Sequence, residues 1–88
     1  MPAGEIAAVI EAYVREQGEV PDDDTLFDQD ADLFEFGYVD SVGFVKLVVW
    51  LEQTYDVKLT EAYLLDERFN TISGIASIVD GRVAERIR

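Results

Sequence analysis

The sequence predicts an all-α fold, a four-helix bundle of three main helices and one short helix, with a long loop between the first two. Three segments carry apolar residues at spacings of three and four, the period of a helix with one buried face. The chain has 88 residues, of which 49% are hydrophobic, so it can bury one core. We therefore expect a single domain over residues 1–88.

The first helix is expected over residues 5–17. Gly18 is a residue at which a helix can end, and Pro21 follows it shortly afterwards. The apolar side chains of this segment form one stripe, which consists of Ile6, Val9, Ile10, Tyr13 and Val14.

Residues 19–40 form the predicted loop. They show no sustained period, and they contain nine acidic residues without a lysine or an arginine. A loop of this length is uncommon in a short chain and indicates a function. The acids either attract basic protein surfaces or form a solvated surface that keeps the protein soluble. Two apolar clusters are expected to hold the loop against the core: Leu26 with Phe27, and Leu33 with Phe34 and Phe36.

The second helix is expected over residues 41–55, where length and a 3.6-residue period outweigh the strand preference of several valines. Asp40 or Ser41 is the expected N-cap, because both side chains accept hydrogen bonds from free amides. Trp50 lies off the core stripe, and it is either buried against the acidic loop or exposed as a docking anchor. The stripe consists of Phe44, Leu47, Val48, Leu51 and Tyr55.

Two further helices are expected after this point. A short one over residues 61–66 begins after Thr60 as its cap, with Leu64 and Leu65 as its apolar contacts. The last helix follows a cap at Asn70 or Thr71. Its core residues are Ile72, Ile75, Ala76, Val79 and Val83, and Gly81 is a point where it can end early.

Composition argues against several classes of function. The chain has no cysteine and no histidine, so disulfides, thiolate chemistry and the commonest general base are excluded. A net charge of −12 disfavours nucleic acid and anionic membrane surfaces as partners. No apolar run approaches the ~20 residues of a membrane span. We expect a cytoplasmic protein without membrane insertion.

Two segments partly match functional motifs, a serine nucleophile and a calcium-binding loop, but each lacks required residues. Ser41 as a nucleophile needs a base such as histidine, and Val39 stands where the pattern G-x-S-x-G requires its first glycine. A calcium loop starting at Asp28 has Leu33 at its sixth position and Val39 at its twelfth, where glycine and glutamate are required. We therefore predict no catalytic residue and no metal site.

The remaining candidate for a functional site is Ser41, which stands at the start of a predicted helix. Free amides and the positive end of the helix dipole favour a phosphate there. From the residues alone, Ser41 is either an ordinary helix cap or a site that other proteins modify.

Nearly the whole chain resembles the phosphopantetheine-dependent carrier proteins, the acyl, peptidyl and D-alanyl carriers. The similarity lies in "DLFEFGYVDSVGFVKLVVWLEQTYDVKL" and "FNTISGIASIV". The resemblance implies a bundle of the acyl-carrier type that is not an enzyme. It implies that Ser41 carries a 4′-phosphopantetheine arm, added from coenzyme A by a phosphopantetheinyl transferase that recognises Asp40. The thiol of this arm would hold an acyl or aminoacyl group as a thioester.

Two departures from the fatty-acid carriers refine the resemblance. Tyr38 and Val39 both stand between Gly37 and the Asp-Ser pair, as in D-alanyl carriers and some freestanding carriers of natural-product pathways. The second helix also has few acids. The hypothesis is a freestanding, monomeric carrier for polyketide or nonribosomal peptide-type biosynthesis. The alternatives are a D-alanyl carrier for cell-wall polymer modification and a cofactor-free acidic adaptor.

The expected partners are the transferase, an adenylating or acyl-loading enzyme, and downstream acyl- or aminoacyl-processing enzymes. They would bind near Ser41, at the loop and the start of the second helix. The candidate surface consists of Phe36, Tyr38, Val42, Val45, Lys46 and Val49.

Overall fold

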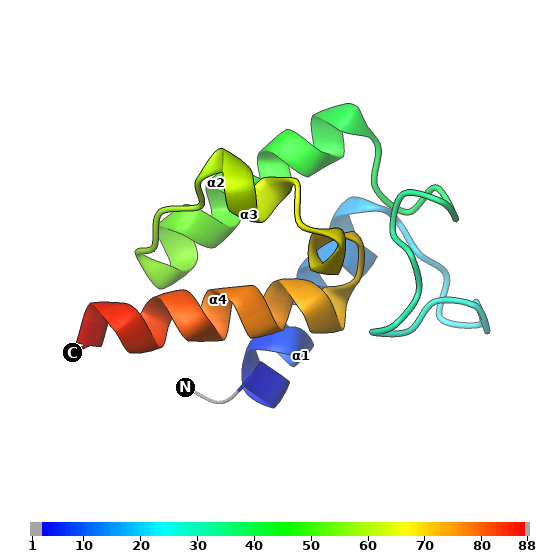
Figure 1. Cartoon of the computed structure of the whole chain (residues 1–88). Coiled ribbons are helices and arrows are strands. Elements are labelled where there is room, and N and C mark those ends of the chain that lie inside the picture. The colour runs from blue at the N-terminus through cyan, green and yellow to red at the C-terminus, as the bar shows by residue number, and fades with distance from the viewer. Residues whose placement is uncertain (1–2, 88) are drawn as a thin grey trace.

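Residues 3–87, the part of the chain that the computed structural model describes, contain three long helices and two short ones (Figure 1). They confirm the predicted all-α fold, and the order is α1 (Ala3–Gln17), α2 (Ser41–Tyr55), α3 (Glu61–Leu64), the 3₁₀ helix η1 (Glu67–Asn70) and α4 (Ile72–Ile87). Residues 1, 2 and 88 of the predicted domain lie outside the described residues. No helix within residues 3–87 is long and apolar enough to cross a membrane.

The core lies between α1, α2 and α4. Helix α1 passes behind α4 and packs most closely against it, while α2 lies above (Figure 1). Val9 was expected in the α1 stripe but is 42% exposed, and Ala7 is buried in its place. The stripe is centred between Ile6 and Val14, so Val9 falls at its edge. The most deeply buried side chains include Ile6, Ile10, Leu33, Leu47, Leu51, Phe69, Ile72, Ile75 and Val79.

Helix α2 buries a narrow stripe. Leu47, Leu51 and Tyr55 are buried as predicted, and Phe44 and Val48 are half-buried.

Trp50 fits neither of its two predicted positions. Its ring stacks on Tyr13 of α1, with centroids 4.1 Å apart and an interplanar angle of 11°. The same ring meets Tyr55 edge to face at 6.5 Å. Trp50 is therefore half-buried between two helices, away from the acidic loop.

Aspartates organise the loop over residues 18–40, which forms an irregular lobe beside the helices (Figure 1). The carboxylates of Asp24, Asp28 and Asp32 accept hydrogen bonds of 2.8 to 3.2 Å from backbone N–H groups two or three residues further along. Such bonds stabilise tight turns. Three of the nine acids therefore shape the backbone as well as supplying charge.

The loop is attached to the core by part of each predicted cluster. Phe27 and Leu33 are buried, but Leu26, Phe34 and Phe36 are exposed. Backbone bonds complete the attachment: the N–H of Leu33 donates to the carbonyl of Asn70 at 2.8 Å, and that of Ser73 donates to Gln29 at 2.8 Å. The loop is thus tied to the segment that enters α4.

The region between α2 and α4 differs from the prediction. Helix α3 ends at Leu64, and Leu65, an expected core contact, is 77% exposed. The chain turns there into η1, which was not predicted, and Phe69 of η1 occupies the core instead. Thr60 stands at the N-cap of α3, but its side chain makes no capping hydrogen bond.

Helix α4 begins after Thr71, whose Oγ1 accepts a hydrogen bond from the N–H of Gly74 at 3.0 Å. Thr71 is therefore the cap, and Asn70 is not. A Cβ on Gly74 would lie 1.8 Å from the carbonyl oxygen of Arg68, so only glycine lets η1 approach α4 this closely. Gly81 lies inside α4 and does not end it.

Candidate functional site

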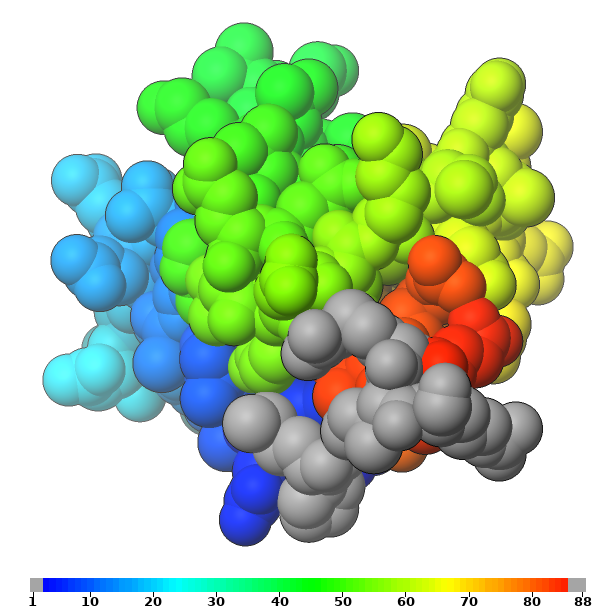
Figure 2. Space-filling view, turned by 90° about the vertical axis from the view of Figure 1, so that its left-hand side faces the viewer, coloured from blue at the N-terminus to red at the C-terminus, as the bar shows by residue number. Residues whose placement is uncertain are grey.

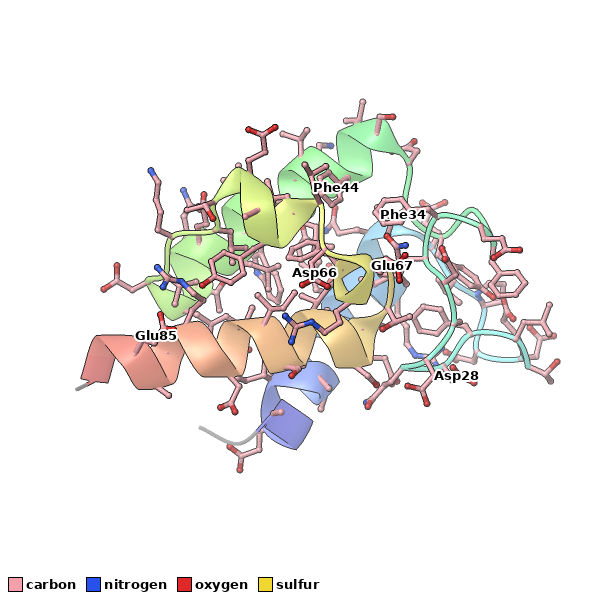
Figure 3. The ribbon with its side chains drawn as sticks, in the orientation of Figure 1. Asp28, Phe34, Phe44, Asp66, Glu67 and Glu85 are labelled. Atoms are coloured by element: carbon pink, nitrogen blue, oxygen red, sulfur yellow. The ribbon has the colours of Figure 1, made fainter. Side chains whose placement is uncertain are left out.

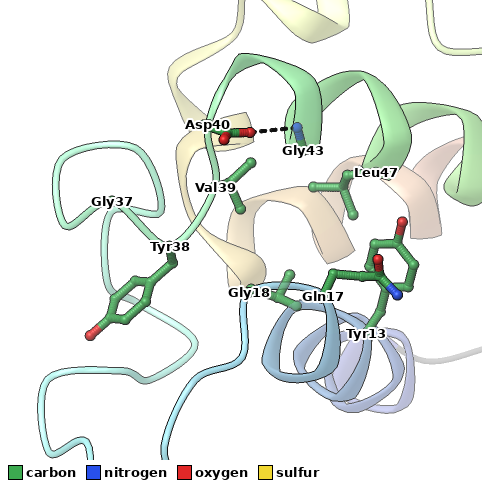
Figure 4. A pocket seen from close by; sticks show the side chains of 10 residues that line it. Tyr13, Gln17, Gly18, Gly37, Tyr38, Val39, Asp40, Gly43 and Leu47 are labelled. Atoms are coloured by element: carbon green, nitrogen blue, oxygen red, sulfur yellow. Dashed lines mark hydrogen bonds between the residues drawn. The ribbon is translucent and has the colours of Figure 1, made fainter.

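Asp40 is the N-cap of α2. Its backbone is extended, and its Oδ1 accepts a hydrogen bond of 2.7 Å from the N–H of Gly43 (Figure 4). The helix itself begins at Ser41. Of the two candidate caps, Asp40 therefore performs this role.

Ser41 is exposed at the first position of a 15-residue helix. Within residues 3–87 its hydroxyl makes no hydrogen bond, and the capping bond to the first turn comes from the neighbouring Asp40 carboxylate. The backbone dipoles of α2 place partial positive charge at this end of the helix. An anionic group on the Ser41 oxygen would therefore meet a favourable field and displace no internal bond.

The segment before Ser41 is held in place from several directions. Gly37 has a φ of 76°, in the left-handed region that glycine adopts without strain. The N–H of Val39 donates to the carbonyl of Leu33 at 3.0 Å, and the Val39 side chain is buried. A Cβ on Gly18 would lie 2.9 Å from the carbonyl oxygen of Tyr38, so the end of α1 approaches this segment closely.

Gly18 follows the end of α1, as predicted, but the left-handed residue there is Glu19, with a φ of 51°. Glycine is thus required at position 18 because the backbone of Tyr38 lies so close, and not because of the backbone angles of residue 18.

Tyr38 and Asp24 fix the outer side of this segment. The Tyr38 hydroxyl donates a hydrogen bond of 2.9 Å to Asp24 Oδ2. The backbone N–H of Leu26 and this phenol help to hold the pKa of the Asp24 carboxyl below its ordinary value. Partial burial, followed by the bond to Asp24, raises the pKa of the Tyr38 phenol. At neutral pH a charged carboxylate thus accepts from a neutral phenol.

Two hollows lie beside residues 39 and 40. One is a cavity of about 260 Å³ between the end of α1 and the start of α2, and its lining includes Tyr13, Gln17, Gly18, Asp40, Gly43 and Leu47 (Figure 4). The other is a groove of about 610 Å³ that includes Ser41 itself. The groove is lined by Phe34, Val39, Asp40, Ser41, Phe44, Val45, Leu64 and Asn70. Sequence reasoning did not anticipate the groove, because its walls come from four elements, the loop, α2, α3 and η1.

Several of the predicted partner-surface residues gather on one face of α2. Val42, Val45 and Val49 are 64%, 61% and 46% exposed, and their spacing places them on the same side of the helix. Lys46 and Phe36 are also exposed. Helix α2 extends across the centre of the molecular face in Figure 2, with α1 beside it.

Tyr38 differs from the rest of this set. It is half-buried, and its ring packs edge to face on Phe27 at 4.8 Å.

No metal centre is formed by the described part of the chain, where no three acidic side chains converge suitably. The aspartates that suggested a calcium loop are used differently, since Asp28 and Asp32 bind backbone N–H groups of their own turns.

Comparison with known proteins identifies the family. Residues 8–79 match the family described as "Phosphopantetheine attachment site". The chain belongs to the phosphopantetheine-binding carrier protein family. It is 38% identical over 58 residues to a D-alanyl carrier protein of Lactococcus lactis subsp. cremoris (strain MG1363), covering 66% of this chain and 73% of that protein.

A D-alanyl carrier protein of Streptococcus pyogenes serotype M5 (strain Manfredo) is 37% identical over 51 residues, which is 58% of this chain. The chain spans 65% of the length of that relative.

Membership of the family makes the chain a carrier protein and not an enzyme, with phosphopantetheine as its cofactor. The structure fits this group, because it offers an exposed, unengaged hydroxyl at the positive end of a helix, beside an open groove.

Proposed function

We propose that this carrier protein is of the D-alanyl type, with the phosphopantetheine arm attached to Ser41. The observation that carries the proposal is the division of roles between two neighbours. Asp40 caps α2 through Gly43, and the Ser41 hydroxyl is left exposed for a transferase. When bound, the arm supplies a thiol that holds an aminoacyl group as a thioester, which explains how a chain without cysteine carries such a group.

The similarity to D-alanyl carriers supports D-alanine as the cargo, in place of the natural-product role expected from the sequence. The two residues between Gly37 and Asp40 fit this assignment and the natural-product role equally, so the choice rests on the similarity to D-alanyl carriers. In the proposed role, the protein receives D-alanine from an adenylating enzyme and presents it for the modification of a cell-wall polymer. Its cytoplasmic location and monomeric state stay predictions.

We assign the recognition of the transferase to Asp40 and the docking of partner enzymes to the surface around Ser41. Val42, Val45 and Val49 offer exposed apolar area on α2, and Lys46 of the same helix and Phe36 of the preceding loop are also exposed. During attachment, Ser41 Oγ would form a bond to the phosphorus that bears the pantetheine group, while the P–O bond to the other phosphate of coenzyme A breaks. The leaving group is 3′,5′-ADP, and the serine proton passes to a base of the transferase. The base and the metal ion for this step belong to the transferase.

The test is modification in vitro. The protein is incubated with coenzyme A, Mg²⁺ and a broad-specificity phosphopantetheinyl transferase, and its intact mass is measured. We expect one arm per chain. Ser41→Ala should remain unmodified, and Ser77→Ala, an exposed serine on α4, should be modified like the parent. Absence of a mass gain, or a gain that persists in Ser41→Ala, would favour the cofactor-free adaptor.

A second step tests the cargo. The modified protein is offered D-alanine, L-alanine and other amino acids with an adenylating enzyme from a D-alanyl system. We expect a further mass gain with D-alanine that hydroxylamine removes, because hydroxylamine cleaves thioesters. Selective loading of a different amino acid would contradict the D-alanyl assignment and leave the carrier role intact.

A further inference from the structure

Lys46 is the one basic residue of α2, and it lies within the apolar face formed by Val42, Val45 and Val49, the valine face. Val42 stands four residues before Lys46 and Val49 three residues after it, so both lie on its side of the helix. All four side chains are exposed. The stem of a lysine covers apolar surface while its ammonium group stays in water. The valine face therefore presents one positive charge among apolar side chains.

The ammonium group of Lys46 makes no ion pair and no hydrogen bond within residues 3–87. Its own helix has no acid three or four residues away, the distances at which side chains on a helix meet. Arginines elsewhere are paired, although the chain has 19 acids and 7 bases. The pairs are Arg15 with Glu11, Arg68 with Asp66 and Arg82 with Glu85, and Figure 3 labels Asp66 and Glu85. The charge of Lys46 is thus available to another molecule.

A partner that covers the valine face removes this ammonium group from water. A charge buried without a counter-charge is costly, and a carboxylate placed opposite compensates for that cost. A lysine or arginine placed opposite would be repelled. The face therefore fits an apolar surface that has an acidic side chain within it.

The position of Lys46 also indicates which partner this surface belongs to. Asp40 and Lys46 line one hollow of about 210 Å³ between α1 and α2. In the proposed function the transferase recognises the Asp40 carboxylate, so it brings positive charge to this hollow, and Lys46 repels that charge. The loading enzyme must also reach Ser41, and the valine face begins at the next residue. Lys46 therefore suits the loading enzyme better than the transferase.

We propose that Lys46 is a specificity-determining residue for loading. The adenylating enzyme places apolar side chains against Val42 and Val49 and a carboxylate against the Lys46 ammonium group. This inference rests on the proposed function and adds the sign of the charge that the loading enzyme presents to α2. That sign is opposite to the basic surface that the acidic loop attracts.

The test measures loading of D-alanine onto the modified protein by the adenylating enzyme of a D-alanyl system. Lys46→Glu should lower kcat/KM about tenfold or more, chiefly through a higher KM, because two carboxylates then repel each other at the docked surface. Lys46→Gln should lower it about threefold, because the ion pair is lost without repulsion. Lys58→Glu reverses the same charge at an exposed lysine beyond the far end of α2 and should load like the parent. Modification of Lys46→Glu by the transferase should not slow.

Sodium chloride gives a second readout. The advantage of the parent over Lys46→Gln should shrink as the salt concentration is raised, because screening weakens an ion pair between exposed groups. A difference that is independent of salt would show that the stem of the lysine, and not its charge, contacts the enzyme. That result would overturn the proposal.

Thermal unfolding first checks that each variant is folded, and Lys46→Gln carries the test if Lys46→Glu is not. Equal loading of the parent and the folded Lys46 variants would overturn this inference and leave the carrier role intact. Equal slowing of loading and of modification in Lys46→Glu would overturn the assignment to the loading enzyme. If the parent takes up no arm or no D-alanine, the proposed function fails, and this inference fails with it.

Discussion

The two segments that meet at Ser41 have opposite surfaces. Residues 19–40 carry nine acids and no base, and many of their turns depend on carboxylates that bind the backbone. Helix α2 carries one acid, Glu52, and its carboxylate accepts from the N–H of Leu59 at 2.9 Å. Its outer face presents three exposed valines instead.

The two surfaces are suited to different stages of partner binding, the acidic loop to encounter and the apolar face of α2 to contact. Charge acts at long range and speeds encounter with a basic partner, and salt weakens it. Apolar area acts only on contact, where its removal from water stabilises the complex. A partner that docks at Ser41, as proposed, would contact both segments, so mutations in each segment can separate the two contributions.

The two segments also differ in how they are attached to the core. The largest effect that we expect on stability tests the attachment of the loop. Leu33 is 0% exposed and is a central anchor of the loop. We expect Leu33→Ala to lower the free energy of unfolding by about 3 kcal/mol, because it leaves a cavity in the core. Leu26→Ala, at a position 62% exposed, should change it by less than about 0.5 kcal/mol. Chemical denaturation measures both, and similar effects would mean that the loop is not anchored at Leu33.

The second prediction concerns the apolar face of α2. Val42→Ala/Val49→Ala removes exposed apolar area without touching the groove. We expect kcat/KM for loading by the adenylating enzyme to fall about tenfold, as for interface residues that matter to binding. Thermal unfolding should hardly change. The matched control, Gln53→Ala/Thr54→Ala, alters exposed polar residues of the same helix and should load normally. Equal loading of all three proteins would place the docking surface elsewhere.

Asp40 lies at the junction of the two segments. Two variants distinguish the effect of its capping hydrogen bond from the effect of its negative charge. Asp40→Ala should lower the free energy of unfolding by about 1 kcal/mol, because the N–H of Gly43 loses its partner. Asp40→Asn keeps an acceptor oxygen and should be close to the parent in stability. If the transferase recognises the carboxylate, both variants should be modified slowly. Equal destabilisation of the two variants would argue against the capping role.

The smallest expected effect is the pH dependence of the turn at Asp24. Its pKa is depressed by the N–H of Leu26 and by other hydrogen bonds, including that of Tyr38, so its ionised form stabilises the folded state. This contribution is fully present above the ordinary aspartate pKa of about 3.9 and is lost as the pH falls through the lower folded-state value. The Tm advantage of the parent over Asp24→Ala should therefore be constant near neutral pH and shrink below about pH 4. If the Tm difference between the parent and Asp24→Ala does not vary with pH, the ionised Asp24 carboxylate does not stabilise the folded state.

The long helices were predictable because their apolar period determines which face is buried. Ile6, Ile10, Leu47 and Leu51 lie in the core as their spacing requires. The position of Ser41 at the start of α2 followed from the same pattern. The choice of Asp40 as the cap did not, because aspartate and serine cap helices about equally well.

Other features depend on how distant segments meet. Trp50 lies at the edge of the α2 stripe, and its stacking on Tyr13 follows from the crossing of two helices. The 3₁₀ helix η1 has four residues, too few to show a period, so Phe69 could not be assigned to the core. The groove joins Phe34, Phe44 and Leu64, which no local pattern relates.

The capping role of Asp40 determines how modification of Ser41 would affect the fold. The bond that starts α2 belongs to a residue that stays chemically unchanged, so esterifying the neighbouring hydroxyl breaks nothing that supports the helix. With the arm on Ser41, as proposed, folding would not depend on modification. A chain that has not yet been modified would then already have its final shape, and removal of the arm would leave the fold intact.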